Sequence, residues 1–274
     1  MDTCFDCPSG FERAAGNVTQ CVEIPIPADN KPLIIGLAVG GSLLLVAIVA
    51  VAVMCEYRRR SGSRSNSNAP RGTSDVAVIF TDIKSSTRMW GAAPMSMGVS
   101  LDAHHSIIRE CIGEQRGYEV KTVGDSFMIV VEDAQRALDL AVSIQHKLYN
   151  HKWPSALDDA YDSNFEDFDI VDDPEDVYGP EDGAPWNGLR VRIGVHYGPV
   201  EVILDAVTKG YDYYGPTVNV AARVEGVTDG GQLCVTAALM AAVQPTTATY
   251  QSLLLAKTTL RGVKDEMEVY EIKP

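Results

Sequence analysis

The sequence predicts an α+β protein, in which a ferredoxin-like βαββαβ domain with extra C-terminal strands and helices is preceded by one transmembrane helix. Three observations lead to this prediction. A stretch of 23 residues near the N-terminus carries no charge. Short β-branched runs then alternate with segments of helical periodicity, in the order strand, helix, hairpin, helix, strand. Apolar residues make up 46% of the 274 residues, which is enough for a sizeable core.

The uncharged stretch runs from Leu33 to Cys55. A helix of that length spans roughly 34 Å, whereas the hydrocarbon core of a bilayer is about 30 Å thick. A cleaved signal peptide is disfavoured because the stretch is too long and begins too far into the chain. The predicted organisation is an outer segment 1–32, a transmembrane helix 33–55, a basic linker 56–74 and a globular domain 75–274.

The flanking charges predict the orientation of this helix. Five arginines follow it within the linker, whereas only Arg13 and Lys31 precede it. Because cytoplasmic flanks carry the positive excess, we expect a single-pass protein of the plasma membrane with its globular domain in the cytoplasm. The outer segment holds three cysteines, which suits an oxidising compartment, and Asn17 lies in a glycosylation sequon. It is too short for a ligand-binding domain, so we expect the stub of a larger ectodomain, either truncated here or lost, whose extracellular ligand is unknown.

A net charge of −14 argues against a nucleic-acid partner, because such surfaces carry a basic excess. The acidity is concentrated in an insertion, residues 153–188, whose twelve acidic residues account for all but two of these charges. Six aromatic side chains in the same segment favour a packed subdomain over a solvated tail. A calcium loop starting at Asp162 is an alternative, although Asp167 and Asp173 replace the Gly and Glu that it needs.

The globular domain reads as alternating strands and helices. The predicted elements are a buried strand at 76–80, an amphipathic helix at 96–115, strands at 118–123 and 127–131 around the turn Gly124-Asp125, a helix capped by Asp133, and a strand at 189–196. Cys111 and Cys234 are predicted to be core thiols, and His104 and His105 surface or interface groups.

Two aspartates occupy positions that this layout brings together. Asp82 lies at the C-terminal end of the first strand, and Asp125 lies in the hairpin turn. In a split βαββαβ sheet the first strand lies beside the hairpin, so the two carboxylates should converge. Paired carboxylates are ligands that hard divalent cations prefer. The alternative is that both are ordinary residues, since Asp is common at strand ends and in Gly-Asp turns.

Three sequence blocks surround these residues. They are FTDIKSST at 80–87, KTVGDSF at 121–127 and YDYYGPTVNVAAR at 211–223. Together, in this order across residues 74–274, they resemble the class III nucleotidyl cyclase domain. The outer segment, single span, single cyclase domain and acidic insertion are similar to those of the receptor-type adenylate cyclases of trypanosomatid parasites.

The resemblance implies conversion of ATP to 3',5'-cyclic AMP and pyrophosphate for intracellular signalling, by a two-metal mechanism. Asp82, Asp125 and the carbonyl of Ile83 match the ligands of two Mg²⁺ ions, which Mn²⁺ can replace. Asn219 and Arg223 match the pair that acts at the transition state.

Helical spacing supports the pairing of Asn219 with Arg223, because Pro216 suits the first turn of a helix that would carry both residues on one face. Lys264 lies near the family's triphosphate-binding Lys, although the Lys-Gly-Lys-Gly pattern of the mammalian branch is missing.

Lys121 and Asp212 match the two positions that read the purine, where adenylate cyclases carry Lys and Asp and guanylate cyclases carry Glu and Cys. The chemistry agrees. Lys only donates hydrogen bonds, which suits adenine N1, and an ionised Asp only accepts them, which suits the adenine N6 amino group. ATP is therefore the expected substrate.

The resemblance also implies a homodimer with shared active sites, and a GxxxG pattern at Gly36 and Gly40 would permit helix pairing in the membrane. Two alternatives stay open. One is a catalytically idle cyclase-like module that binds nucleotide or a signalling partner. The other is a diguanylate cyclase, whose Gly-Gly-Asp/Glu-Glu-Phe signature is replaced here by VGDSF at 123–127.

Overall fold

The computed structural model describes residues 66–162 except Thr73, then 186–243, 250–258 and 266–273, with residues 9, 11–13, 21–24 and 51 nearer the N-terminus. The chain divides into two compact units, Met1–Ser63 and Arg64–Pro274. In the first unit β1 (Phe11–Arg13) pairs antiparallel with β2 (Cys21–Glu23), and Cys21 is disulfide-bonded.

The predicted membrane span 33–55 lies outside the described residues apart from Val51, as do linker residues 56–65. Among the residues that are described, no helix combines the length and the apolar character needed to cross a bilayer.

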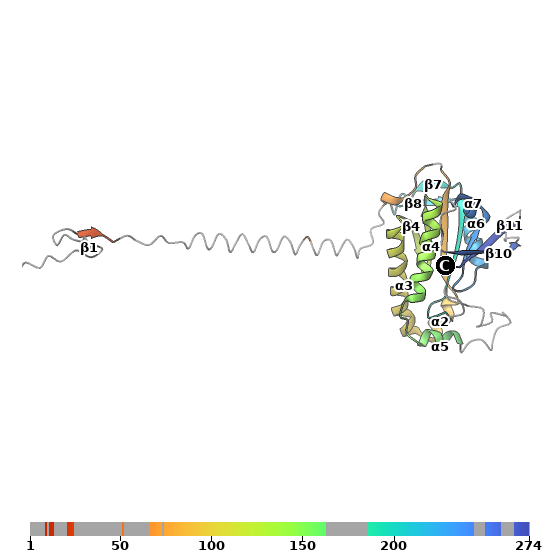
Figure 1. Ribbon diagram of the computed structural model, residues 1–274, viewed down its shortest axis with the longest axis horizontal. Coiled ribbons are helices and arrows are strands. Elements are labelled where there is room, and N and C mark those ends of the chain that lie inside the picture. Colours follow the sequence, from red (N-terminus) through yellow and green to blue (C-terminus); the bar gives the residue numbers. More distant parts are fainter. Residues whose placement is uncertain are drawn as a thin grey trace, which may run out of the picture. The chain divides into compact units, whose positions relative to one another are not determined.

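The second unit is built on a seven-stranded sheet with the order β10-β11-β9-β6-β3-β5-β4 (Figure 1). Its strands are β3 (Val76–Ile83), β4 (Tyr118–Val123), β5 (Ser126–Val131), β6 (Val191–Gly198), β9 (Leu233–Thr236), β10 (Gln251–Thr258) and β11 (Met267–Lys273). β6 and β9 pair in parallel, and the other neighbours in this sheet are antiparallel. β7 (Glu201–Leu204) and β8 (Tyr211–Tyr214) form a separate antiparallel hairpin.

The predicted βαββαβ order is confirmed. The two crossover helices are α3 (Pro94–Glu114) and α4 (Ala134–Asn150), and β3 lies between β5 and β6. Asp133 caps α4 by accepting a hydrogen bond from the Arg136 amide at 2.8 Å, as its position predicts. β3 ends at Ile83, one residue beyond Asp82, which therefore lies at the C-terminal end of the strand as predicted.

Helices cover both faces of the sheet. The side chains of Ala77 and Ile79 pack into the cluster that includes α3, α4 and α7 (Ala237–Ala242). Val76 and Val78 belong to the opposite cluster, which includes Ala221 of α6 (Pro216–Val227). Figure 1 shows α3 and α4 running side by side along the sheet. Asp82 shares the strand face of Val76 and Val78, so it lies on the α6 side.

Two short helices, α2 (Ser86–Ala92) and α5 (Ala156–Asp162), pack against each other outside this framework, and a 3-10 turn at Asn66–Asn68 precedes β3. α5 belongs to the predicted acidic insertion, whose residues 163–185 lie outside the described part of the chain. The proposed calcium loop falls almost wholly there.

Cys111 and Cys234 are buried, which confirms that they are core thiols. The prediction for His104 is wrong, because this side chain is fully buried on the core face of α3. Burial lowers the pKa of His104 to about 3, so its ring is neutral under physiological conditions. Its neighbour His105 is half-buried and contacts the Gly124 carbonyl oxygen through Nε2 at 3.1 Å.

Candidate functional site

The two predicted metal ligands, Asp82 and Asp125, are brought together by the pairing of β3 with β5. Ser126 Oγ donates a hydrogen bond to Asp82 Oδ1. The backbone N–H of Ile83 donates to Asp125 Oδ2 at 3.2 Å. Each carboxylate is therefore held by the residue next to the other one, and the predicted convergence is confirmed.

The donor set at this point consists of oxygen atoms. Within the described residues, no three His, Cys, Asp or Glu side chains cluster as they would in a zinc site. Two carboxylates beside a strand end instead suit a hard cation that takes its remaining ligands from backbone carbonyls, water and substrate phosphates. These residues fit Mg²⁺ or Mn²⁺.

Arg192 is a part of this site that the sequence reasoning missed. It lies opposite Asp82 in the β3–β6 pairing, and its Nη2 donates to Asp82 Oδ2. Its Nε lies 3.0 Å from Glu225 Oε1 on α6. The signal was available, because a charged residue within a predicted buried strand needs a partner of opposite charge.

Glu225 belongs to α6, and its side chain is mostly buried. Burial raises the pKa of its carboxyl, and the Arg192 guanidinium opposes that rise. Arg192 thus bridges two carboxylates, one on the sheet and one on the helix above it.

The predicted purine-reading residues also lie together. Lys121 Nζ on β4 is 3.0 Å from both carboxylate oxygens of Asp212 on β8. Asp212 also accepts hydrogen bonds from the Tyr213 amide at 2.9 Å and the Tyr214 hydroxyl at 3.0 Å. Burial opposes ionisation of Asp212, but the Lys121 ammonium and these donors outweigh it and lower the pKa of Asp212.

Asn219 and Arg223 lie on the exposed face of α6. Pro216 occupies the first turn, as predicted, and the buried stripe of the helix faces the sheet. Neither side chain makes a hydrogen bond or an ion pair within the part of the chain that the structure describes. Lys264, the predicted triphosphate-binding residue, lies outside the described residues.

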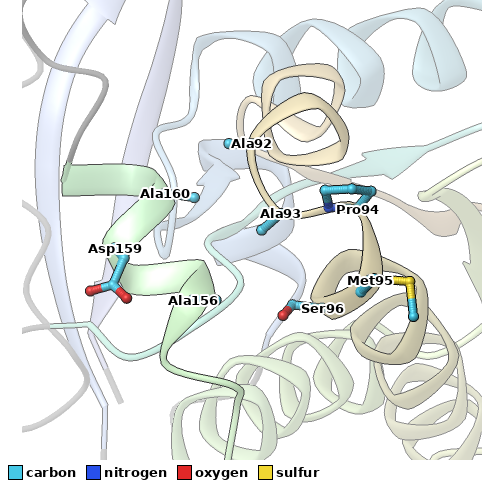
Figure 2. A pocket seen from close by; sticks show the side chains of 8 residues that line it. All are labelled: Ala92, Ala93, Pro94, Met95, Ser96, Ala156, Asp159 and Ala160. Carbon is cyan, nitrogen blue, oxygen red and sulfur yellow. The ribbon is translucent and has the colours of Figure 1, made fainter.

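A pocket of about 380 Å³ lies away from these residues, between α5 and the corner that joins α2 to α3 (Figure 2). Its lining consists of residues 92–96 on one side and Ala156, Asp159 and Ala160 on the other, and Ser96 and Asp159 are its polar members. None of the predicted site residues lines this pocket.

Comparison with known proteins places these residues in a family context. Residues 69–274 match the family model described as the adenylate and guanylate cyclase catalytic domain. Receptor-type adenylate cyclase A of Leishmania donovani is 40% identical over 254 residues, which cover 90% of this chain and 18% of that protein. A receptor-type adenylate cyclase of Trypanosoma congolense is 40% identical over 267 residues, covering 89% of this chain and 34% of that protein.

This chain therefore spans between 18% and 34% of the length of these two relatives. A solved structure of adenylate cyclases from Trypanosoma brucei in their monomeric state superposes on this chain with a TM-score of 0.68 at 40% sequence identity. The match covers 76% of this chain and 94% of that one.

Proposed function

This chain belongs to the adenylate and guanylate cyclase catalytic domain family, and we propose that it converts ATP to 3',5'-cyclic AMP and pyrophosphate. The observation that carries the choice of ATP is the pairing of Lys121 with Asp212 at 3.0 Å. It sets one donor and one acceptor close enough to meet the edge of a single base. Relatives named adenylate cyclases at 40% identity support the same choice.

Adenine and guanine offer opposite patterns to this pair. Adenine presents an acceptor at N1 beside the donor at N6, which matches the donor Lys121 and the acceptor Asp212. Guanine presents a donor at N1 and an acceptor at O6, so both contacts would be mismatched. Each unsatisfied buried group costs about 1–3 kcal/mol, and two mismatches would disfavour GTP by roughly thirty-fold or more.

Asp82, Asp125 and the carbonyl of Ile83 are the residues that would hold two Mg²⁺ ions, with Mn²⁺ as a substitute. Bound there, the ions would acidify the ribose 3'-hydroxyl and neutralise charge on the triphosphate. The N–H of Ile83 orients Asp125, and Ser126 orients Asp82. Arg192 lies beside Asp82, where its guanidinium can donate to a phosphoryl oxygen.

The exposed pair on α6 would complete the site. Arg223 would stabilise negative charge that develops on the α-phosphate, and Asn219 would orient the ribose. The reaction needs both residues and both aspartates at one substrate, yet no hydrogen bond or ion pair joins the two sets within the described chain. We therefore infer a homodimer in which each site takes the aspartates from one copy and the α6 and purine-reading residues from the other.

The proposed cellular setting follows from the sequence outside the described residues. The span 33–55 would anchor the chain in the plasma membrane, with residues 1–32 outside and the cyclase domain in the cytoplasm. Relatives named receptor-type cyclases support this arrangement.

The test is direct. The purified 274-residue chain is incubated with Mn²⁺ and either ATP or GTP, and cyclic nucleotides are measured by mass spectrometry. We expect cyclic AMP from the wild type and none above background from Asp125→Asn. Nucleotide binding without any cyclic product, in a preparation that is folded and dimeric, would instead identify an idle cyclase-like module.

A further inference from the structure

A tyrosine from the inserted connection reaches the end of the strand that carries Asp82. Tyr161 lies near the C-terminal end of α5 and is 7% exposed. Its hydroxyl donates a hydrogen bond to the carbonyl oxygen of Lys84 at 3.0 Å and accepts one from the amide of Arg190 at 3.4 Å. The Arg190 guanidinium lies 4.4 Å from the centre of its ring. Neither α5 nor Tyr161 belongs to the βαββαβ framework.

The β3–β6 pairing continues for one hydrogen bond beyond the ends of the two strands. The amide of Lys84 donates to the carbonyl of Arg190 at 2.8 Å, directly after the last strand pair of Ile83 with Val191. A peptide group is planar and trans, so fixing the N–H of Lys84 also fixes the carbonyl of Ile83, which points the opposite way. The direction of a proposed metal ligand thus depends on how firmly Lys84 is held.

The next peptide group is held by Tyr161. Ser85 follows with φ 57°, a left-handed conformation that a residue other than glycine adopts only where its surroundings enforce it. The hydrogen bond from Tyr161 to the Lys84 carbonyl fixes the peptide that enters this turn. Without it, the Lys84 carbonyl loses its hydrogen-bond donor, and the peptide that enters the turn is held less firmly.

The inserted connection is itself tied down at both ends. Asp158 Oδ1 on α5 accepts a hydrogen bond from the amide of Gly188 at 2.7 Å, which joins the start of the insertion to its end. α5 packs against α2 and α3, next to the pocket in Figure 2. Burial raises the pKa of Tyr161 to about 12, so its hydroxyl remains a donor at physiological pH.

We propose that Tyr161 is a positioning residue for the metal site, through which α5 controls the affinity of the cyclase domain for its divalent cations. This inference rests on the proposed function, because it takes Asp82, Asp125 and the Ile83 carbonyl as the ligands. Tyr161 touches neither substrate nor metal. It acts through the backbone of Lys84.

The test compares Tyr161→Phe with Tyr149→Phe in the full 274-residue chain. Tyr149 is a matched control, because it also packs near the insertion, against Trp186, but its hydroxyl has no hydrogen-bond partner among the described residues. Mn²⁺ affinity is measured without nucleotide from the electron paramagnetic resonance signal of the free ion, and the melting temperature is measured in EDTA.

We expect Tyr161→Phe to weaken Mn²⁺ binding about fivefold, the factor that one net hydrogen bond corresponds to, while Tyr149→Phe leaves it unchanged. The Mn²⁺ concentration for half-maximal cyclic AMP synthesis should rise by the same factor, with kcat at saturating Mn²⁺ within about twofold of wild type. Asp158→Ala, which loosens α5 without altering the core, should weaken Mn²⁺ binding in the same direction.

A lower melting temperature with unchanged Mn²⁺ affinity in Tyr161→Phe would show a purely structural role and overturn the inference. So would equal affinity losses in Tyr161→Phe and Tyr149→Phe. If Tyr161→Phe does not fold, an unchanged Mn²⁺ affinity in Asp158→Ala overturns it. Since Mn²⁺ binding is measured without turnover, a wild type that makes no cyclic AMP refutes the proposed function alone.

Discussion

Arg192 and Asp82 face each other across the β3–β6 pairing, and the guanidinium of Arg192 donates a hydrogen bond to Asp82 Oδ2. An arginine and a divalent ion are competing partners for the same oxygen. The arginine has a second partner in Glu225, 3.0 Å from its Nε, to which it can transfer its interaction when Asp82 binds metal.

Arg192→Gln should therefore separate metal binding from turnover. Without the competing cation, Mn²⁺ binding to the nucleotide-free chain should tighten several-fold. Cyclic AMP synthesis should nevertheless fall at least tenfold, because a donor to the triphosphate is lost. Mn²⁺ titration and the cyclic AMP assay on the same preparation check the two effects. Weaker Mn²⁺ binding would contradict the competition between Arg192 and metal.

The same substitution should make stability depend on pH. It leaves Glu225 buried without its cation, which costs about 1–3 kcal/mol while the carboxyl is ionised. Burial raises the pKa of Glu225 in the folded state. The penalty therefore grows as the pH rises from the pKa of Glu225 in the unfolded state to its pKa in the folded state, and it disappears at lower pH. Urea unfolding of Arg192→Gln and wild type should differ more at pH 8 than at pH 5.

Substitution of the two predicted purine-reading residues should change the preference of the enzyme from ATP towards GTP. Lys121→Glu combined with Asp212→Cys replaces the donor by an acceptor and removes the carboxylate, which matches the guanine pattern and not the adenine pattern. ATP turnover should fall at least tenfold, and the ratio of ATP to GTP turnover should shift towards GTP. Competition assays with both nucleotides measure the ratio. An unaltered ratio would mean that these residues do not contact the base.

Lys121→Glu alone is the matched control for that experiment. It places two carboxylates at the 3.0 Å contact, so this variant should be less stable than the double variant as well as inactive. Thermal melting distinguishes loss of recognition from loss of folding.

The metal ligands should be essential for activity and dispensable for folding. Asp82→Ala or Asp125→Ala should lower cyclic AMP synthesis by about a thousandfold or more, because the site loses half of its negative side chains. Arg192 keeps Glu225 as a partner when Asp82 is removed, so the melting temperature should change by only a few degrees. Near-normal turnover in either variant would argue against the two-metal site.

Mixing two inactive variants tests whether the sites are shared. In a dimer of one Asp82→Ala chain and one Asn219→Ala chain, one site collects both lesions and the other is intact. Random pairing makes about half of the dimers mixed, so activity should recover to about a quarter of wild type. Recovery should rise with protein concentration. A mixture that stays at background, while wild type is active at the same concentration, would exclude sharing.

Local sequence signals were sufficient for most of the framework. The turn Gly124-Asp125 between two β-branched runs predicts the hairpin by itself, and the strand order then brings Asp82 to Asp125. The placement of residues 219 and 223 on one face of α6 was also predictable from a local signal. Pro216 marks the first turn of the helix, and residues four apart in a helix share a face.

Partners set by tertiary packing were not predictable in this way. His104 was misjudged as a surface residue although it lies on the same helical face as Met97 and Ile108, so the apolar spacing of α3 could have placed it in the core. Arg192 meets Asp82, and Tyr161 meets Lys84, across more than 70 residues of the chain. The first contact depends on strand pairing, and the second on a seven-residue helix without a strong periodic pattern. The membrane span and Lys264 stay predictions.

The contact between α6 and β6 has a consequence for how evolution can alter this enzyme. A Cβ atom at Gly194 would lie 2.1 Å from the backbone nitrogen of Glu225, so the helix rests directly on the strand. Even a methyl group at position 194 would lift α6 and with it Asn219 and Arg223, without changing either residue. In the proposed dimer, the position of Asn219 and Arg223 relative to the second copy would therefore depend on the absence of a Cβ atom at Gly194. A substitution at this one position would impair catalysis at a shared site and leave Asp82 and Asp125 unchanged.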